Sequence, residues 1–331
     1  MKHFFVINPH SFKKASARLS RLSLEINSCF SGKDKSEYKI YVSRYSRDAI
    51  SAVHRYLLEA GGEPVRVYAI GGDGILFDCL NGVIDFPNVE LTNIPYGSSN
   101  DFLRAFGEDA HAKFRDIESL INGTPHAIDI MHAGSNYAMN EINIGLIGQT
   151  IINSNTIFPK IPRALLKKYT GLAYTFCGMK ALFDSDINKQ QYTIIVDEEE
   201  EINGCLMNIH VANTACNGGT LTPSPYAKPN SGHLEAVIAK TSSKFKTAKA
   251  IGRYNKGKFE KFDFFIHRKC KTLEIKSDSI LKMEMDGEGF LSNDVKLEIL
   301  PAHINFFAPE GVTFVDFSHT AFTRREGANQ T

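Results

Sequence analysis

The tetrapeptide Gly71-Gly72-Asp73-Gly74 has the composition of a phosphate-binding loop. Glycine lets a backbone turn tightly and come within contact distance of a ligand, and backbone N–H groups at the start of a helix bind anions. Asp73 adds a carboxylate, which is a ligand type that Mg²⁺ prefers. The pattern predicts a site for a magnesium-bound phosphate, and an ordinary glycine-rich turn is the competing interpretation.

A second polar loop occupies residues 96–104. Ser98 and Asn100 are good helix N-caps and good hydrogen-bond donors to phosphate or ribose. Asp101 and Arg104 are three residues apart, so both fall on one helix face near the same ligand. A capped helix that carries a surface ion pair is the alternative.

Each of these loops follows a predicted strand. Val65–Ile70 is apolar enough for a buried strand, and Leu91–Pro95 predicts the next one. A short helix is expected after the first loop, from Ile75 to Gly82, where Gly82 would end it. Ligands of open α/β sheets bind beyond the carboxyl ends of the strands, so both loops are expected at one site.

The rest of the N-terminal part alternates strand and helix, which predicts a mainly parallel sheet covered on both faces. Strands are expected over Phe4–Ile7 and Tyr38–Val42. Helices are expected over Lys13–Phe30, Arg47–Glu59 and Phe114–Ile121.

From about residue 127 onward, strand-like segments dominate and predict an antiparallel β-sandwich. A helical stretch from Pro162 to about Phe183 interrupts them. The expected strands are Tyr137–Ile144, Gln191–Val196, Cys205–Ala212, Leu234–Ala239, Phe262–His267, Thr272–Lys276, Leu281–Met285 and Val295–Leu300.

A third polar motif, Asp286-Gly287-Glu288, follows the strand-like segment Leu281–Met285. Asp-Gly is a strong signal for a two-residue hairpin turn. Such a turn at a domain edge can direct Glu288 into a cleft between domains.

Composition sets limits on the class of protein. The chain has 331 residues, which favours two domains. Its net charge of +1 argues against a general nucleic-acid binder. No run is long enough to predict a membrane span, and residues 1–9 predict a strand rather than a signal peptide. The six cysteines lack CxxC spacing, as is typical of a reducing cytosol, and no zinc-ligand spacing is present.

Together the motifs resemble the diacylglycerol kinase catalytic-domain family, which includes sphingosine kinases and the bacterial diacylglycerol kinase and YegS-like lipid kinases. They fall in the family's order from residue 4 to about residue 310, so the resemblance covers nearly the whole chain. The set is specific, although no single motif is. The segments that carry the resemblance are Asn8–Ser11, Gly71–Gly74, Pro95–Arg104, Asp129, Asn217–Gly219, Pro225–Ala227 and Asp286–Glu288.

The resemblance implies a Rossmann-like three-layer nucleotide-binding domain followed by an antiparallel β-sandwich domain, as in NAD kinases and diacylglycerol kinases. The ATP-binding catalytic domain is expected over 1–127, with 304–320 returning to it. The lipid-substrate domain is expected over 128–303.

The resemblance also implies a site for ATP and Mg²⁺. Asp73 would hold the magnesium ion, with support from Asp101 and Asp129, and Arg104 would balance these carboxylates or contact the phosphates. Glu288 would be the general base that accepts the proton of a lipid hydroxyl. The residues implied in ATP binding are Asn8, Pro9, His10, Ser11, Phe12, Ser43, Gly71, Gly72, Asp73, Gly74, Ile75, Leu76, Phe77, Gly97, Ser98 and Asn100.

Several positions depart from the family pattern. Phe12 stands where glycine is usual, Ile75 where threonine is usual, and Ser98 replaces a threonine conservatively. Residues 145–148 lack the acid of the usual Phe-Asp-Ala motif. Residues 230–232 lack the Asp-Gly pair that holds a structural magnesium in bacterial relatives. These departures bear on nucleotide affinity and metal content rather than on the fold.

Two basic segments bear on a membrane contact. Pro159–Lys180 mixes cations with apolar side chains, and is either an amphipathic helix on an anionic membrane or a surface helix packed on the β-domain. Lys240–Lys261 holds eight basic residues against one acid, and these either bind phospholipid headgroups or form the solvated face of a helix or loop. The expected location is the cytoplasm, with transient contact at the inner face of the membrane. A homodimer is a further expectation.

The main hypothesis is an ATP- and Mg²⁺-dependent kinase that phosphorylates a membrane lipid, with diacylglycerol giving phosphatidic acid as the first candidate. Other candidate acceptors are a sphingoid base, another long-chain alcohol or a soluble nucleotide. A nucleotide- or lipid-binding regulator without catalysis is the alternative from another class. Phe12 and Ile75 motivate that alternative, while Asp73, Asp101 and Glu288 argue against it.

Overall fold

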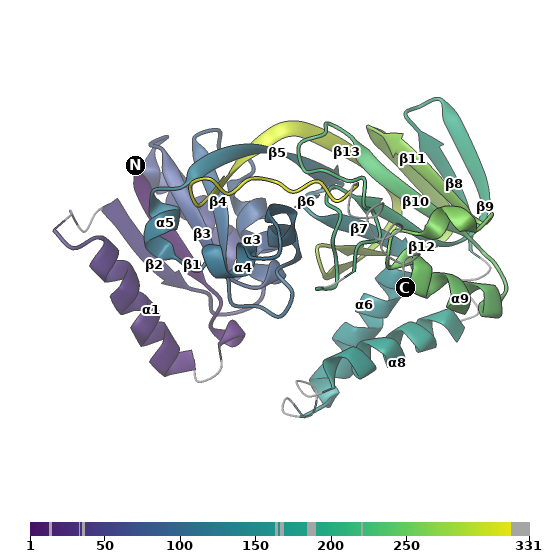
Figure 1. Cartoon of the computed structure of the whole chain (residues 1–331), viewed down its shortest axis with the longest axis horizontal. Coiled ribbons are helices and arrows are strands. Elements are labelled where there is room, and N and C mark those ends of the chain that lie inside the picture. Colours follow the sequence, from purple (N-terminus) through teal and green to yellow (C-terminus); the bar gives the residue numbers. More distant parts are fainter. Residues whose placement is uncertain are drawn as a thin grey trace, which may run out of the picture. The chain divides into compact units, whose positions relative to one another are not determined.

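The computed structural model describes residues 1–12, 15–32, 34, 37–162, 165, 169–183, 190–219 and 221–318 (Figure 1). The chain divides into two compact units. The first comprises Met1–Ile130, Cys216–Thr220 and Leu300–Asp316, and the second comprises Met131–Ala215, Leu221–Ile299 and the residues from Phe317 onward. Strands β5 (Thr124–Ala133) and β13 (Glu288–Ala308) contain residues of both units.

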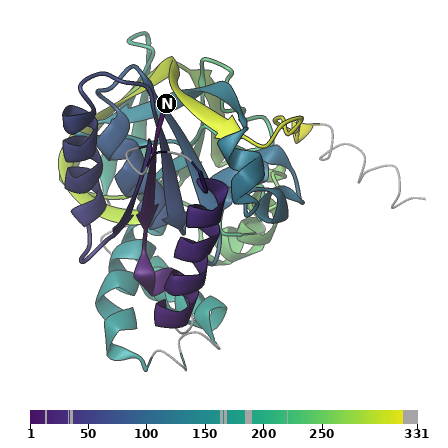
Figure 2. The same cartoon turned by 90° about the vertical axis from the view of Figure 1, so that its left-hand side faces the viewer.

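The first unit is built on a parallel sheet. Its strands lie in the order β2 (Tyr38–Val42), β1 (Lys2–Ile7), β3 (Val65–Gly71), β4 (Val89–Pro95) and the C-terminal part of β13. Helices α2 (Asp48–Ala60) and α3 (Asp73–Val83) pack together on one face, and α1 (Ala15–Cys29) packs with α5 (Ile117–Ile121) on the other (Figure 2). The remaining helical segments of this unit are η1 (Pro9–Ser11), η3 (Asp101–Phe106) and α4 (Ala110–Lys113).

Strand β1 shows why this sheet needs cover on both faces. Successive side chains of a strand point to opposite faces. Phe4 stacks on Tyr56 of α2, with ring centroids 4.1 Å apart, while Phe5 stacks on Tyr68 of β3 at 4.2 Å. Phe5 also meets Phe30, which follows α1, at 6.0 Å. Both faces are therefore apolar and buried, as expected for a parallel strand in a three-layer unit.

Two helix predictions in the first unit are wrong in detail. Gly82 does not end α3 but lies inside it, where an added Cβ would come within 2.8 Å of Val53 Cβ on α2. The missing side chain thus lets the two helices approach. The single helix expected from Phe114 to Ile121 is replaced by α4 and α5, because Asp116 starts a new helix by accepting a hydrogen bond from Ser119 N at 3.1 Å.

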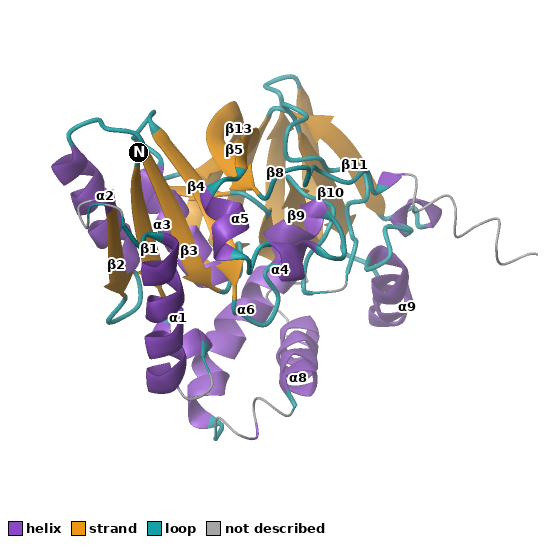
Figure 3. Ribbon diagram, turned by 60° about the vertical axis from the view of Figure 1, so that its left-hand side comes forward, coloured by secondary structure: helices purple, strands orange, loops and turns teal. Residues whose placement is uncertain are grey.

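The second unit is an antiparallel β-sandwich, which confirms the expected fold class. Helices α6 (Leu146–Ile157), α8 (Thr170–Phe183) and α9 (Lys244–Tyr254) lie on one side of its strands (Figures 1 and 3). Its short helical segments are η4 (Phe158–Lys160) and η5 (Phe259–Lys261). The strands pair in the order β11 (Phe265–Cys270), β10 (Leu234–Lys240), β9 (Glu200–Ala212), β7 (Glu141–Gly145), β12 (Thr272–Met285) and β13, with β8 (Gln191–Val196) against β9 and β12, and β6 (Asn136–Ala138) against β5.

Several boundaries in this unit differ from the predictions. The strand expected over Tyr137–Ile144 is split into β6 and β7, whereas Thr272–Lys276 and Leu281–Met285 belong to one strand, β12, whose pairing with β13 shifts register between Lys276 and Leu281. Helix α6 is not predicted by the sequence, and α9 lies in the basic segment Lys240–Lys261, where a solvated helix is one of the alternatives. Of the helical stretch expected from Pro162, the structure contains α8, and residues 163–164 and 166–168 lie outside the described residues.

The unit boundaries also differ from the expected domains in one informative respect. Residues 216–220 group with the first unit, although the sequence places them within the second domain. The returning segment is Leu300–Asp316. In the part of the chain that the structure describes, no helix is both long and apolar enough to cross a bilayer.

Candidate active site

The loop at the end of β3 meets the loop at the end of β1. A Cβ on Gly71 would lie 2.9 Å from Ser11 Oγ and 3.2 Å from Asn8 Cβ, so the two loops pack directly on each other. Asn8 holds its own loop, because its Oδ1 accepts a hydrogen bond from His10 N at 3.0 Å. The structure thus brings together two of the segments that the sequence assigns to ATP.

The loop after β4 joins them through backbone contact. The N–H groups of Tyr96 and Gly97 donate to the carbonyl of Gly71 at 2.8 and 3.0 Å. A Cβ on Gly97 would lie only 2.3 Å from Gly72 Cα. Glycine at residue 97 is therefore required for the two loops to touch.

We expect Gly97→Ala to destabilise the first unit by about 1–3 kcal/mol and to weaken nucleotide binding, because the new methyl group must push the two loops apart. Thermal unfolding and ATP titration measure the two effects. Gly252→Ala is the control, since no atom lies within 4 Å of its added Cβ. Equal stability of Gly97→Ala and the parent would contradict the packing argument.

Asp73 connects the glycine loop to the loop after β4. It is the first residue of α3, and its two carboxylate oxygens accept hydrogen bonds from Asn100 N at 3.0 Å and Asp101 N at 2.8 Å. Asn100 has a left-handed backbone with φ 52°, and its side chain donates to Gly71 O and to Asn93 Oδ1, each at 2.8 Å. The prediction that Asn100 caps the next helix with its side chain is therefore wrong.

Asp101 is held by a segment that the site prediction omitted. Its Oδ1 accepts a hydrogen bond from Gly219 N at 2.7 Å. Gly218 and Gly219 both have positive φ, 53° and 80°, which aims backbone N–H groups at the carboxylate. The paired glycines after Asn217 were the available signal in the sequence.

The carboxylates of Asp73 and Asp101 are both buried, and their negative charges repel each other. Burial raises the pKa of Asp73. Burial, together with the charge of Asp73, raises the pKa of Asp101 to about 7, and the Arg104 guanidinium opposes this shift. Arg104 Nε is buried and has no hydrogen-bond partner among the described residues. The site thus combines two buried carboxylates, Asp73 and Asp101, with Arg104, whose Nε–H has no acceptor among the described residues.

These donors fit a magnesium-bound phosphate. Mg²⁺ is usually bound by one or two carboxylates together with substrate phosphates and water. Asp73 and Asp101 supply that number of carboxylates, and within the described ranges there is no cluster of three or more His, Cys, Asp or Glu side chains that could hold a metal ion. A bound cation would also relieve the repulsion that raises their pKa values.

The raised pKa of Asp101 predicts a pH-dependent stability. Between its ordinary pKa of 3.8 and about 7, the folded protein holds a proton that the unfolded chain has released, so the free energy of unfolding falls as pH rises across this window. We expect Asp101→Asn to flatten this slope and to unfold at a higher temperature than the parent at about pH 8 without Mg²⁺. Thermal unfolding from about pH 5 to about pH 8 measures it.

Asp116→Asn is the matched control. Hydrogen bonds from Ser119 lower the pKa of Asp116, so its contribution to stability has the opposite sign and is lost as pH falls. An unchanged slope in Asp101→Asn would show that Asp101 ionises normally.

The other residues expected to bind ATP differ from one another in burial. Ser43 N donates to Ile7 O at 2.9 Å, which places Ser43 beside the loop that follows β1, and Ser98 is exposed. Phe12 is buried against Tyr96, with ring centroids 4.8 Å apart. The side chains of Ile75, Leu76 and Phe77 are at most 3% exposed, so they belong to the core, and only their backbone atoms could reach a ligand.

Asp129 lies on β5 and has a structural partner. Its Oδ1 accepts a hydrogen bond from Ala302 N at 2.9 Å, which holds the backbone of β13 at a residue whose φ is positive, 49°. Its support of a magnesium ion stays a prediction.

Glu288 lies in the second unit, directly after a two-residue hairpin turn. Asp286 and Gly287 both have positive φ, 46° and 90°, and Met285 pairs with Glu288 across the turn. The carboxylate of Asp286 accepts hydrogen bonds from the N–H groups of residues 139, 140 and 141 at 2.8–3.0 Å. The turn is thereby anchored, and the position of Glu288 at the start of β13 is fixed. Its role as general base stays a prediction.

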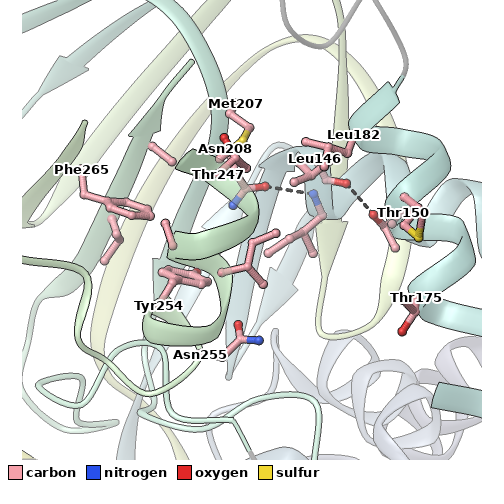
Figure 4. A pocket seen from close by; sticks show the side chains of 17 residues that line it. Leu146, Thr150, Thr175, Leu182, Met207, Asn208, Thr247, Tyr254, Asn255 and Phe265 are labelled. Atoms are coloured by element: carbon pink, nitrogen blue, oxygen red, sulfur yellow. Dashed lines mark hydrogen bonds between the residues drawn. The ribbon is translucent and has the colours of Figure 1, made fainter. Parts of the chain in front are cut away.

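A cavity of about 320 Å³ lies in the second unit between α6, α8, α9 and strands β9 to β11 (Figure 4). Its lining is mostly apolar. Two hydroxyls of lining residues, Tyr254 OH and Thr247 Oγ1, are buried without a hydrogen-bond partner in the described part of the chain. The accessible surface of the pocket is therefore apolar, and it suits an apolar ligand.

Comparison with known proteins places this arrangement in a family. The model of the diacylglycerol kinase catalytic domain matches residues 2–133, and that of the YegS C-terminal NAD kinase beta sandwich-like domain matches residues 163–308. The chain belongs to the diacylglycerol kinase and YegS-like family of lipid kinases. Family membership implies the use of ATP.

Individual relatives agree with this assignment. A protein of Shewanella frigidimarina (strain NCIMB 400) named "Probable lipid kinase YegS-like" is 28% identical over 261 residues, 77% of this chain and 80% of that protein. The "Diacylglycerol kinase" of Bacillus subtilis (strain 168) is 24% identical over 223 residues, 67% of this chain and 70% of that protein. A crystal structure of a diacylglycerol kinase from Bacillus anthracis str. Sterne has the same fold, with a TM-score of 0.66 at 20% identity over 94% of this chain and 98% of that chain.

Proposed function

We propose that the protein uses ATP and Mg²⁺ to phosphorylate the hydroxyl group of a membrane lipid. Diacylglycerol, which would give phosphatidic acid, is the first candidate acceptor. The observation that supports a lipid acceptor most directly is the mostly apolar pocket of the second unit, because a soluble nucleotide acceptor has no use for it.

The first unit would hold the phosphate donor. Phosphoryl transfer requires positioning and charge neutralisation more than covalent chemistry. The glycine loops present backbone N–H groups, Asp73 and Asp101 would hold the magnesium ion, and Arg104 has an unused donor for phosphate oxygens. When bound, Mg²⁺ offsets the negative charge of the phosphates.

The second unit would hold the acceptor. The resemblance in the motif Asp286–Glu288 assigns the proton-accepting role to Glu288, and the anchored hairpin gives that carboxylate a defined place. A general base removes the hydroxyl proton as the oxygen attacks phosphorus.

The size of the pocket favours a second candidate acceptor. A volume of about 320 Å³ is at the low end of the range for small-molecule sites and suits one hydrocarbon chain better than two. A single-chain alcohol, such as a sphingoid base, therefore competes with diacylglycerol.

Phosphate transfer from γ-labelled ATP to a membrane lipid extract with Mg²⁺ tests the proposal, beside Glu288→Gln. A labelled lipid formed by the parent and not by the variant would support it, and chromatography of the product separates phosphatidic acid from a single-chain phosphate. Label on a soluble acceptor, or ATP binding without any transfer, would contradict it.

A substitution that fills the pocket tests whether the pocket holds the acceptor. A Cβ on Gly178 of α8 would meet only Thr150, at 3.8 Å, so Gly178→Leu fits the helix while its longer side chain occupies the cavity. We expect the KM for a long-chain acceptor to rise about tenfold, while the KM for ATP stays unchanged. An acceptor with a chain too short to fill the pocket should show no difference. Unchanged kinetics with the long-chain acceptor would exclude this pocket as its site.

A further inference from the structure

Helix α8 carries an apolar stripe that remains exposed. Leu172, Phe176, Met179 and Phe183 follow one another at spacings of four, three and four residues, so they share one helix face. Their exposed fractions lie between 54% and 67%. A contiguous apolar strip of this kind on a protein surface marks an interaction site.

The stripe is continuous with the pocket. Met179 belongs both to the stripe and to the pocket lining. On α9, Ile251 also lines the pocket and is 39% exposed. Helices α8 and α9 thus form two walls of the pocket, and each presents an apolar side chain that is shared between the cavity and the surface.

The charges of the two helices are of one sign. Lys246, Lys249 and Arg253 of α9 are exposed and spaced by three and four residues, which puts them on one face. Neither helix sequence contains an aspartate or a glutamate. Phe245, at the start of α9, is 87% exposed. Apolar side chains flanked by cations are typical of helices that lie in the interface of an anionic membrane.

We propose that α8 and α9 together dock the protein on an anionic bilayer. The stripe of α8 enters the acyl-chain boundary, and the cations of α9 lie against the phospholipid headgroups. The pocket then opens at the bilayer surface, so an acceptor chain enters it along apolar surface. This last step rests on the proposed function; the docking itself does not.

A second copy of the chain is the other occupant that such a stripe would suit. In a two-fold dimer identical patches face each other. The cations of α9, and Lys180 of α8, would then meet their own copies with no acid on either helix to pair with them. An anionic membrane supplies the opposite charge. The charges of α8 and α9 therefore favour a membrane over a second copy of the chain.

Co-sedimentation of the full chain with vesicles tests the docking surface without ATP or transfer. The vesicles are phosphatidylcholine alone or with about 30 mol % phosphatidylglycerol. We expect the parent to bind the anionic vesicles, and Phe176→Glu with Phe183→Glu to lower that binding about tenfold or more. Lys246→Glu with Lys249→Glu should remove the preference for anionic vesicles. If the glutamate pair lowers the unfolding temperature, Phe176→Ser with Phe183→Ser replaces it.

Two controls match these changes. Leu291→Glu introduces the same charge at a side chain that is 64% exposed in the same unit, and Lys269→Glu reverses an exposed cation outside α9. Both should bind vesicles like the parent. Equal binding by parent and stripe variants would overturn the proposal, as would light scattering that shows a dimer which Phe176→Glu dissociates while vesicle binding persists. Co-sedimentation measures vesicle binding and does not require phosphate transfer. A negative kinase assay would therefore not change the interpretation of the binding result.

Discussion

Asp73→Asn should lower the rate of phosphate transfer about 10³-fold while the protein stays folded. The side chain keeps its size and one acceptor for the N–H groups of Asn100 and Asp101. It loses the negative charge that would hold a cation beside the phosphates. Initial rates at saturating lipid, with thermal unfolding in parallel, measure the effect.

A second buried aspartate on α3, Asp78, is the control that distinguishes the loss of the Asp73 charge from a loss of folding. Asp78 is buried on α3 and pairs with Arg47 at 3.0 Å. Asp78→Asn removes a buried carboxylate and its ion pair with Arg47, but it should retain transfer. Equal losses of activity in the two variants would mean that Asp73 acts through stability alone.

Glu288→Gln should reduce the turnover number by about 10²–10⁴-fold, the range expected for loss of a general base. The amide keeps the shape of the side chain and cannot accept the proton. The parent should show a turnover number that rises with pH until its base is ionised, and the variant should lose that limb. Affinity for ATP, measured by titration, should stay the same, since Glu288 belongs to the second unit.

Glu298→Gln provides the comparison on the same strand. Glu298 pairs with His132 at 2.8 Å and is assigned no part in transfer. It should retain both the rate and the pH profile. A Glu288→Gln protein with the parent's profile would remove Glu288 from the mechanism.

The turn that carries Asp73 could be predicted from the sequence because its signals are local. A buried strand followed at once by glycines and Asp73 specifies a turn, a helix start and a carboxylate within a few residues. Gly219 could not be placed in the same way, since it contacts Asp101 across 118 residues of chain. Only the fold brings those two together, and the extra N–H donor is what gives Asp101 its fixed orientation.

The apolar pocket of the second unit was harder to predict for a different physical reason. Helix α6 has no charged residue in its sequence and several β-branched ones, so its pattern lacks the polar face that marks a surface helix. Helix α9 is rich in lysine, a composition that suits a loop equally well. The pocket forms only where both helices pack over the strands. No single segment of the sequence therefore predicts it.

Strand β13 has a consequence for biosynthesis. Its last residues supply the partner of β4, through the pairs Asn305–Glu90 and Phe306–Leu91 and the hydrogen bond from Thr92 Oγ1 to Phe307 O at 2.7 Å. Thr92 and Phe307 are separated by 215 residues. During translation, the edge of β4 that pairs with β13 therefore stays unpaired until more than 200 further residues have been made. An open strand edge invites pairing with other chains. The nascent N-terminal unit should accordingly depend on holding chaperones, and chains truncated before β13 should aggregate rather than accumulate as a folded nucleotide-binding fragment.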